Sequence, residues 1–366
     1  MKVISTGRQF SIHNDDLKTY NRIPANVYYL RFSKFKGFYL EQQSELDIKE
    51  PKIYGVHPAK VTKVLNSYKR TNKNLGVILS GHKGIGKSLF AKLLSKTAID
   101  EGYPVIIIDQ PYPDIPGYLE DITQEIVVLF DEFDKTFSIK SEDNPQESLL
   151  SMFDGLSNGK KLFVVTCNKI NELSDYLVNR PGRFLYHFRF EYPNLKEIEE
   201  YLTDKLNPKY YSEIDKVKKF STKINLNYDC LCAIAFELNS GLPFEEAIKD
   251  LNIMNFKPER YNLTLHFEDG KIMTAKRVAI DMFDQTEPSD AYMNDDKGRD
   301  IGYITFNPNE FEYDINTGAN IMAGDKIEYE ANSYYDDHSD YKEFTNLKPK
   351  KLIAHKERDK NLHYMV

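Results

Sequence analysis

Eight residues between positions 81 and 88 combine glycine, lysine and serine at the spacing of a phosphate-binding loop. The segment reads GHKGIGKS and fits the pattern G-x-x-x-x-G-K-[ST] at every fixed position. Its glycines allow backbone N–H groups to curl around phosphates, and the helix expected from Lys87 directs its positive dipole end towards them. We expect Lys87 to reach the β- and γ-phosphates and Ser88 to bind Mg²⁺ through its hydroxyl. The residues predicted to contact nucleotide here are Gly81, His82, Lys83, Gly84, Ile85, Gly86, Lys87, Ser88 and Leu89.

Two adjacent carboxylates follow a short apolar run further along the chain. The run 127–130 precedes Asp131 and Glu132, which places both carboxylates at the C-terminal end of a buried strand. Ligands bind at that end of the strands in open α/β sheets. We expect Asp131 to bind Mg²⁺ through water, and Glu132 to be the general base that orients and polarises an attacking water. With ATP and Mg²⁺ as cofactors, such a site would hydrolyse nucleotide rather than only hold it.

The segments that must position these side chains alternate between strands and helices. Four continuous apolar runs, at 75–81, 104–109, 125–132 and 161–168, are typical of parallel strands buried on both faces. The stretch 87–102 has helical periodicity and ends at a glycine. The pattern predicts an α/β layered fold, in which helices cover both faces of a parallel sheet.

These motifs resemble those of the AAA+ ATPases, and especially the narrower AAA clade, over residues 50–256. Asn168 ends the last of the four runs, where the family has its sensor-1 residue, and LSDYLVNRPGRF at 173–184 is similar to the end of the clade's second region of homology. The resemblance implies that Asn168 helps to position the water. It also implies that Arg180 and Arg183 reach the γ-phosphate bound by the neighbouring subunit, so that hydrolysis depends on assembly.

The resemblance further implies an adenine contact and a lid. The segment KIYGVHPAKVTKVL, upstream of the phosphate loop, is similar to the family's adenine-contacting segment, with Tyr54 and Gly55 as the candidate residues. The helix-period segments within 194–257 correspond to the family's helical lid. Asn194 and Ser212 have the side chains of helix N-caps in that region.

Both ends of the chain lie outside this resemblance. β-Forming, aromatic and basic residues at 26–40 predict a hairpin that turns near Lys36–Gly37. Alternation on either side of Asp269–Gly270 predicts another hairpin, in a small β domain where acidic residues outnumber basic ones. The predicted divisions are an N-terminal segment (1–50), a nucleotide-binding α/β domain (51–193), a helical lid (194–257), an acidic β-rich domain (258–345) and a basic tail (346–366).

Composition excludes several classes of protein. The sequence has no run of about 18 apolar residues, and its N-terminus lacks the apolar stretch of a signal peptide. We therefore expect a cytoplasmic protein, in the host cytoplasm if the source is viral, that crosses no membrane. The net charge of −7 disfavours a surface coated in nucleic acid. The three cysteines predict neither a disulfide framework nor a zinc site.

The sequence supports three hypotheses about the work that ATP drives. The first, favoured by the paired arginines, is a ring-forming motor, expected as a hexamer, that remodels a protein bound by the N-terminal segment or the acidic β domain. Threading members of the clade use an aromatic loop, but the corresponding Tyr112 and Tyr118 lie among prolines and are expected to pack beneath a loop. The second is a nucleic-acid-linked ATPase, in which Arg31, Lys34 and Lys36 with their aromatic neighbours bind single strands. The third is an ATP-regulated structural or interaction protein.

Overall fold

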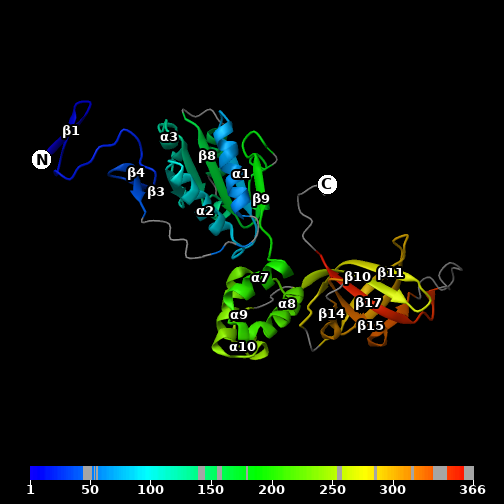
Figure 1. Ribbon diagram of the computed structural model, residues 1–366. Helices are drawn as coiled ribbons and strands as arrows, with labels where there is room; N and C mark the ends of the chain where they lie inside the picture. Colours follow the sequence, from blue (N-terminus) through cyan, green and yellow to red (C-terminus); the bar gives the residue numbers. More distant parts are fainter. Residues whose placement is uncertain are drawn as a thin grey trace. The chain divides into compact units, whose positions relative to one another are not determined.

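The chain forms two compact units, Met1–Pro193 and Asn194–Val366 (Figure 1). The computed structural model describes residues 1–43, 52, 54, 57–138, 145–154, 159–178, 180–253, 258–283, 287–314, 317–332 and 344–357. Across these ranges, no helix has the length and apolar character needed to span a bilayer.

The first unit is built on a seven-stranded sheet with the order β4-β3-β6-β7-β8-β5-β9. The strands are β3 (Val27–Ser33), β4 (Gly37–Gln42), β5 (Leu75–Ser80), β6 (Val105–Ile108), β7 (Ile126–Phe130), β8 (Lys161–Cys167) and β9 (Tyr186–Arg189). Neighbouring strands are parallel except for β3 and β4, which pair as an antiparallel hairpin. The carboxyl ends of β5, β7 and β8 therefore meet at one edge of the sheet. This confirms the predicted α/β fold.

Helices pack on both faces of this sheet (Figure 1). Side chains alternate along β5: Val77 and Leu79 pack with α1 and α2, whereas Ile78 joins the apolar cluster of α3 to α6 on the other face. Burial on both faces explains why the strands are unbroken apolar runs. The helices are α1 (His57–Arg70), α2 (Lys87–Asp100), α3 (Ile115–Glu120), α4 (Phe133–Thr136), α5 (Pro145–Ser148) and α6 (Leu150–Phe153).

The N-terminal segment contributes two strands to the same sheet. The β3 strand pairs in parallel with β6, so the β3–β4 hairpin forms the outer edge of the sheet beyond β6. The aromatic ring of Phe38 on β4 lies 6.1 Å from the ring of Tyr112 and 5.0 Å from that of Tyr118. Both tyrosines are partly buried against the core, and they pack on a residue of a strand rather than beneath a loop. A separate hairpin of β1 (Lys2–Thr6) and β2 (Gln9–His13) precedes these strands.

The second unit begins with a helical region. Its helices are α7 (Leu195–Lys205), the short 3₁₀ helix η2 (Pro208–Glu213), α8 (Ile214–Lys223), α9 (Tyr228–Ser240) and α10 (Phe244–Asp250). Asn194 caps α7 in a capping box with Glu197, as predicted for this asparagine. The prediction of Ser212 as an N-cap is wrong, because Ser212 lies inside η2, which leads directly into α8.

An eight-stranded antiparallel sheet, with the order β14-β15-β17-β10-β11-β12-β13-β16, follows the helices. A turn containing Gly270, at φ 91°, joins β10 to β11, which confirms the predicted hairpin. Residues 349–356, assigned to the tail by their basic composition, form β17 between β15 and β10, because Leu352 and Ala354 are buried in its core. The strands are β10 (Glu259–Phe267), β11 (Ile272–Ile280), β12 (Ser289–Asn294), β13 (Asp300–Phe306), β14 (Glu312–Asp314), β15 (Ala319–Ala323), β16 (Ile327–Ala331) and β17 (Pro349–Lys356).

Candidate nucleotide-binding site

The glycine-rich loop joins the carboxyl end of β5 to α2. Gly84 and Gly86 have φ angles of 78° and 100°, which side chains with a Cβ rarely adopt, so these positions require glycine. A Cβ on Gly81 would collide with the backbone carbonyl of Phe190. The α2 helix begins directly after Gly86, at Lys87. The loop and the first turn of α2 thus have the backbone that a phosphate cradle needs.

Lys87 lies inside this loop rather than in solvent. Its side chain is 8% exposed, and its Nζ donates to the backbone carbonyls of Gly81 and His82, the latter at 2.6 Å. The same ammonium donates to the Asn168 side-chain oxygen at 2.9 Å. Burial lowers the pKa of Lys87, which nearby carboxylates partly oppose. A nucleotide triphosphate would offer this ammonium anionic oxygens in place of carbonyl oxygens.

The two predicted carboxylates follow β7 and are tied to β8. The hydroxyl of Thr166 donates to Asp131 Oδ1 at 2.8 Å and accepts the backbone N–H of Glu132 at 2.8 Å. Glu132 has φ 46°, a left-handed conformation that is strained for a residue with a side chain. The resulting sharp turn leads from β7 into α4. Asn168 hydrogen-bonds to Lys87, and its amide also lowers the pKa of Glu132.

Glu132 also pairs with a lysine that the sequence analysis did not single out. The Lys135 ammonium lies 2.6 Å from Glu132 Oε1. This contact is the main cause of a lowered pKa at Glu132, and the Asn168 hydrogen bond and the charge of Lys83 lower it further. The carboxylate is therefore ionised at neutral pH, as a general base must be.

Asp134 is a second residue that the sequence analysis missed. Its buried side chain accepts the backbone N–H groups of Asn168 and Lys169, each at 3.0 Å. These bonds hold the turn after β8 in place and so position the Asn168 side chain. The signal in the sequence is a third acidic residue, two positions after Glu132 in DEFD.

The other predicted contact residues differ in their environments. The imidazole ring of His82 stacks on Tyr192 at 5.2 Å, and Ile85 is buried in the core. Ser88 is exposed in the first turn of α2. Tyr54 is buried and has the Lys52 ammonium 5.3 Å from its ring, whereas Gly55 lies outside the described residues.

The oxygen atoms available here fit magnesium bound together with phosphates. In the described part of the chain no three metal-ligating side chains cluster tightly enough to hold an ion by themselves. Mg²⁺ needs no such cage, because it keeps several waters and takes one or two protein oxygens alongside the substrate phosphates. The Ser88 hydroxyl and the Asp131 carboxylate are oxygen donors of that kind.

The two arginines before β9 have different environments. Arg183 is 9% exposed, and its guanidinium donates to both carboxylate oxygens of Asp154 and, at 2.6 Å, to the carbonyl of Tyr176. Arg180 is exposed, with its guanidinium 5.4 Å from the ring centre of Tyr176. Arg183 is thus held within its own subunit, while Arg180 lies at the surface.

Comparisons with known proteins agree with this geometry. Residues 77–192 match the family model "ATPase family associated with various cellular activities (AAA)". An ATPase family AAA domain-containing protein of Arabidopsis thaliana is 28% identical over 148 residues, which are 35% of this chain and 12% of that protein. The ATP-dependent zinc metalloprotease FtsH of Aster yellows witches'-broom phytoplasma (strain AYWB) is 28% identical over 196 residues, or 47% of this chain and 27% of that protein.

A third relative, the ATPase histone chaperone of Saccharomyces cerevisiae, is 23% identical over 141 residues, which are 33% of this chain and 10% of that protein. The match to these relatives thus covers between 10% and 27% of their lengths. The stretch that the family model matches contains the phosphate loop, the acidic strand end and the arginine-bearing turn. Residues 77–192 of this chain therefore form a domain of the AAA+ ATPase superfamily.

Proposed function

We propose that this chain hydrolyses ATP with Mg²⁺, assembles into a ring, expected as a hexamer, and uses the energy to remodel a protein partner. The observation that carries the proposal is the Asn168 side chain, which accepts a hydrogen bond from Lys87 at 2.9 Å and lowers the pKa of Glu132. One amide thereby links the cation expected at the phosphates to the candidate base.

In this proposal each side chain has a distinct role. Lys87 binds the β- and γ-phosphates, and Ser88 with Asp131 would hold Mg²⁺, which neutralises phosphate charge when bound. Glu132 accepts a proton from the attacking water, and Asn168 orients that water towards phosphorus. Lys87 would exchange its backbone carbonyl partners for phosphate oxygens when nucleotide binds. Thr166 and Asp134 meanwhile hold the turns that carry Glu132 and Asn168 in place.

The two arginines divide the task that the resemblance assigns to both. We propose that Arg180 reaches the γ-phosphate of the neighbouring subunit, because its guanidinium is exposed. Arg183 acts as a positioning residue, since its bonds to Asp154 and Tyr176 hold the turn that carries Arg180. An arginine supplied in trans stabilises transition-state charge and makes hydrolysis depend on assembly.

Mixing two inactive variants tests both the base and the shared site. Glu132→Gln subunits should bind ATP without turnover, and Arg180→Ala subunits should lose turnover because their neighbours receive no arginine. A mixture should regain measurable ATPase activity at interfaces that pair an intact Glu132 with an intact Arg180.

Sedimentation velocity on the same samples establishes that the subunits assemble together. ATP hydrolysis by Glu132→Gln alone would exclude Glu132 as the base. Mixtures that co-assemble yet stay inactive would contradict the trans role of Arg180.

A protein partner is favoured over nucleic acid by two observations. The metalloprotease and the histone chaperone ATPase, to which the chain is similar, are both named for work on proteins. Arg31, one of the cations considered for nucleic-acid binding, is paired with Asp109 at 2.7 Å and with Glu41 at 3.2 Å. Its charge is therefore neutralised within the subunit. A cytoplasmic location is part of the same proposal.

A further inference from the structure

The tip of the β3–β4 hairpin presents an aromatic side chain to solvent. Phe35 is 100% exposed, and Lys34 and Lys36 flank it in the turn. The strand ends next to the tip are firmly placed: Arg31 pairs with Asp109 beyond the end of β6, and the Phe32 and Phe38 rings lie 5.1 Å apart. A rigid support for an exposed ring is typical of a contact residue, because little conformational freedom is lost when a partner covers it.

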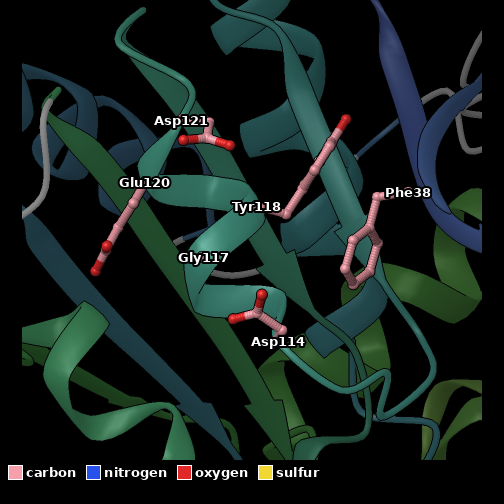
Figure 2. Close-up of a pocket in the computed structure, with 6 residues that line it drawn as sticks. All are labelled: Phe38, Asp114, Gly117, Tyr118, Glu120 and Asp121. Carbon is pink, nitrogen blue, oxygen red and sulfur yellow. The ribbon is translucent and has the colours of Figure 1, made fainter.

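An acidic pocket adjoins the hairpin. It lies between β4 and α3 and is lined by Phe38, Asp114, Gly117, Tyr118, Glu120 and Asp121 (Figure 2). The carboxylates lie at the two ends of α3, and the rings of Phe38 and Tyr118 supply apolar walls. Gly117 keeps the pocket open next to Asp114, because a Cβ there would lie 2.6 Å from Asp114 Oδ1. Phe38 on β4 lies two residues after Lys36, so one hairpin carries both the exposed tip and a wall of the pocket.

We propose that the hairpin tip and the acidic pocket together bind an extended polypeptide segment that carries apolar, acidic and basic side chains. This inference rests on the proposed remodelling of a protein partner and specifies how that partner is held. Phe35 packs against an apolar side chain of the segment, while Lys34 and Lys36 pair with its acidic residues. The pocket takes a basic side chain between the carboxylates and the two aromatic rings.

The charge pattern of the surface selects a polypeptide over a nucleic acid. A phosphate backbone is uniformly negative, so it would be attracted to the two lysines but repelled by Asp114, Glu120 and Asp121 of the pocket. A polybasic chain would be attracted to the carboxylates but repelled by the two lysines. A polypeptide of mixed charge satisfies both halves of the surface at once.

Binding of labelled probes to the full-length chain tests this inference without relying on ATP turnover. The probes are a fluorescein-labelled peptide of alternating Glu and Lys with interspersed Phe and Leu, a peptide with the same apolar residues but only Glu, and a single-stranded oligonucleotide of matched length. Fluorescence anisotropy measures each dissociation constant. We expect the mixed-charge peptide to bind most tightly of the three.

Two variants and a matched control locate the binding surface. Phe35→Ala and Asp121→Asn should each weaken binding of the mixed-charge peptide about tenfold, the size of effect typical of a contact that dominates an interface. Phe10→Ala, which removes a 72% exposed ring on the separate β2 strand, should leave binding unchanged. Thermal melts of all three variants should match the unmodified chain, because these side chains lie at the surface.

Several outcomes would overturn the inference. One is unchanged peptide binding by Phe35→Ala, and another is an equal loss in Phe10→Ala. Tighter binding of the oligonucleotide, lost when Lys34 and Lys36 are replaced by alanine, would assign the tip to nucleic acid instead. ATPase assays of the same samples separate the two proposals: peptide binding without turnover contradicts the proposed enzyme only, and turnover without peptide binding contradicts the docking surface only.

Discussion

The centre and the outer edge of the seven-stranded sheet differ in the interactions that their side chains make. At the carboxyl ends of β5, β7 and β8, polar groups hydrogen-bond to one another, as in the link from Lys87 through Asn168 to Glu132. At the outer edge, Arg31 is neutralised by Asp109, and the most exposed side chain is the apolar Phe35. The centre is arranged for electrostatic work on a small ligand, whereas the edge has apolar surface that only a second molecule can cover.

This difference implies that chemistry and partner binding can be separated by mutation. A linked polar cluster is costly to disrupt, because each lost partner leaves a charge or a buried donor unsatisfied. An exposed ring on a firm hairpin can be removed without affecting any neighbour. Substitutions at the centre should therefore change turnover with little effect on partner binding, and substitutions at the edge should do the reverse.

The largest effect is expected from Asn168→Ala at the centre. This change removes the amide that joins the phosphate-binding lysine to the candidate base, so kcat for ATP hydrolysis should fall by about 100-fold. The dissociation constant for nucleotide should change far less, because the loop backbone and Lys87 remain. Steady-state ATPase assays and the binding of a fluorescent ATP analogue measure the two quantities separately.

Phe35→Ala is the matched control for that comparison, since it lies on the same sheet and should keep the full basal rate. If Asn168→Ala kept its turnover, the link through the amide would have no role in hydrolysis. If Phe35→Ala lost as much turnover as Asn168→Ala, the two regions would not be separable.

The central part of the site could be predicted because its signals are local. Lys87 belongs to a glycine-rich pattern, and Asp131 and Glu132 directly follow an apolar run that can only be a buried strand. The same local signals predicted the α/β fold. Thr166 and Asp134 were not predicted, because their roles depend on contacts between distant segments: Thr166 on β8 bonds Asp131 after β7, and Asp134 on α4 binds the turn after β8. The acidic residue in DEFD marks Asp134, but its spacing does not show which backbone groups it binds.

At the outer edge, too, contacts between distant segments could not be predicted from local sequence patterns. The residues of β3 form a local hairpin with β4, but nothing within residues 27–42 indicates that β3 also pairs with β6, across an interval of more than sixty residues. That pairing covers Tyr112 and Tyr118 with Phe38 and leaves Phe35 exposed instead. Basic composition likewise predicted a tail at 349–356. These residues form a strand instead, because Leu352 and Ala354, two positions apart, are both buried in the core of the sheet.

A smaller effect is expected at the two arginines that precede β9 at the end of the sheet. Arg183 is hydrogen-bonded within the chain, as polar groups at the centre are, whereas Arg180 is exposed, as side chains at the outer edge are. Arg183→Met removes the bonds to Asp154 and Tyr176 and should lower the free energy of unfolding by about 1–2 kcal/mol, since Asp154 is partly hydrated. Arg180→Met should leave stability nearly unchanged. Urea unfolding of the two variants measures the difference, and equal losses would contradict the assignment of Arg183 as the internal support.

The pH dependence of that stability difference follows from Asp154. Its hydrogen bond with Arg183 lowers the Asp154 pKa from the usual 3.8. The pair therefore contributes stability above the unfolded pKa of Asp154, and this contribution is lost as the pH falls through the lower folded pKa. The difference in free energy of unfolding between Arg183→Met and the unmodified chain should be largest at neutral pH and should decrease only in strong acid.

The smallest effect is expected at the boundary of the central cluster, where Lys135 pairs with Glu132. Lys135→Met removes the main cause of the lowered Glu132 pKa, so that pKa should rise and the acid limb of the kcat/KM profile should move to higher pH. Turnover at neutral pH should change little, because the carboxylate stays ionised there.

The Lys135 and Glu132 side chains are 54% and 47% exposed, so added salt should move the acid limb of the unmodified chain towards that of the variant. Lys169→Met breaks a comparable pair with Glu172 and is the control. An acid limb that Lys135→Met leaves in place, or that Lys169→Met moves equally, would show that Lys135 does not tune the base.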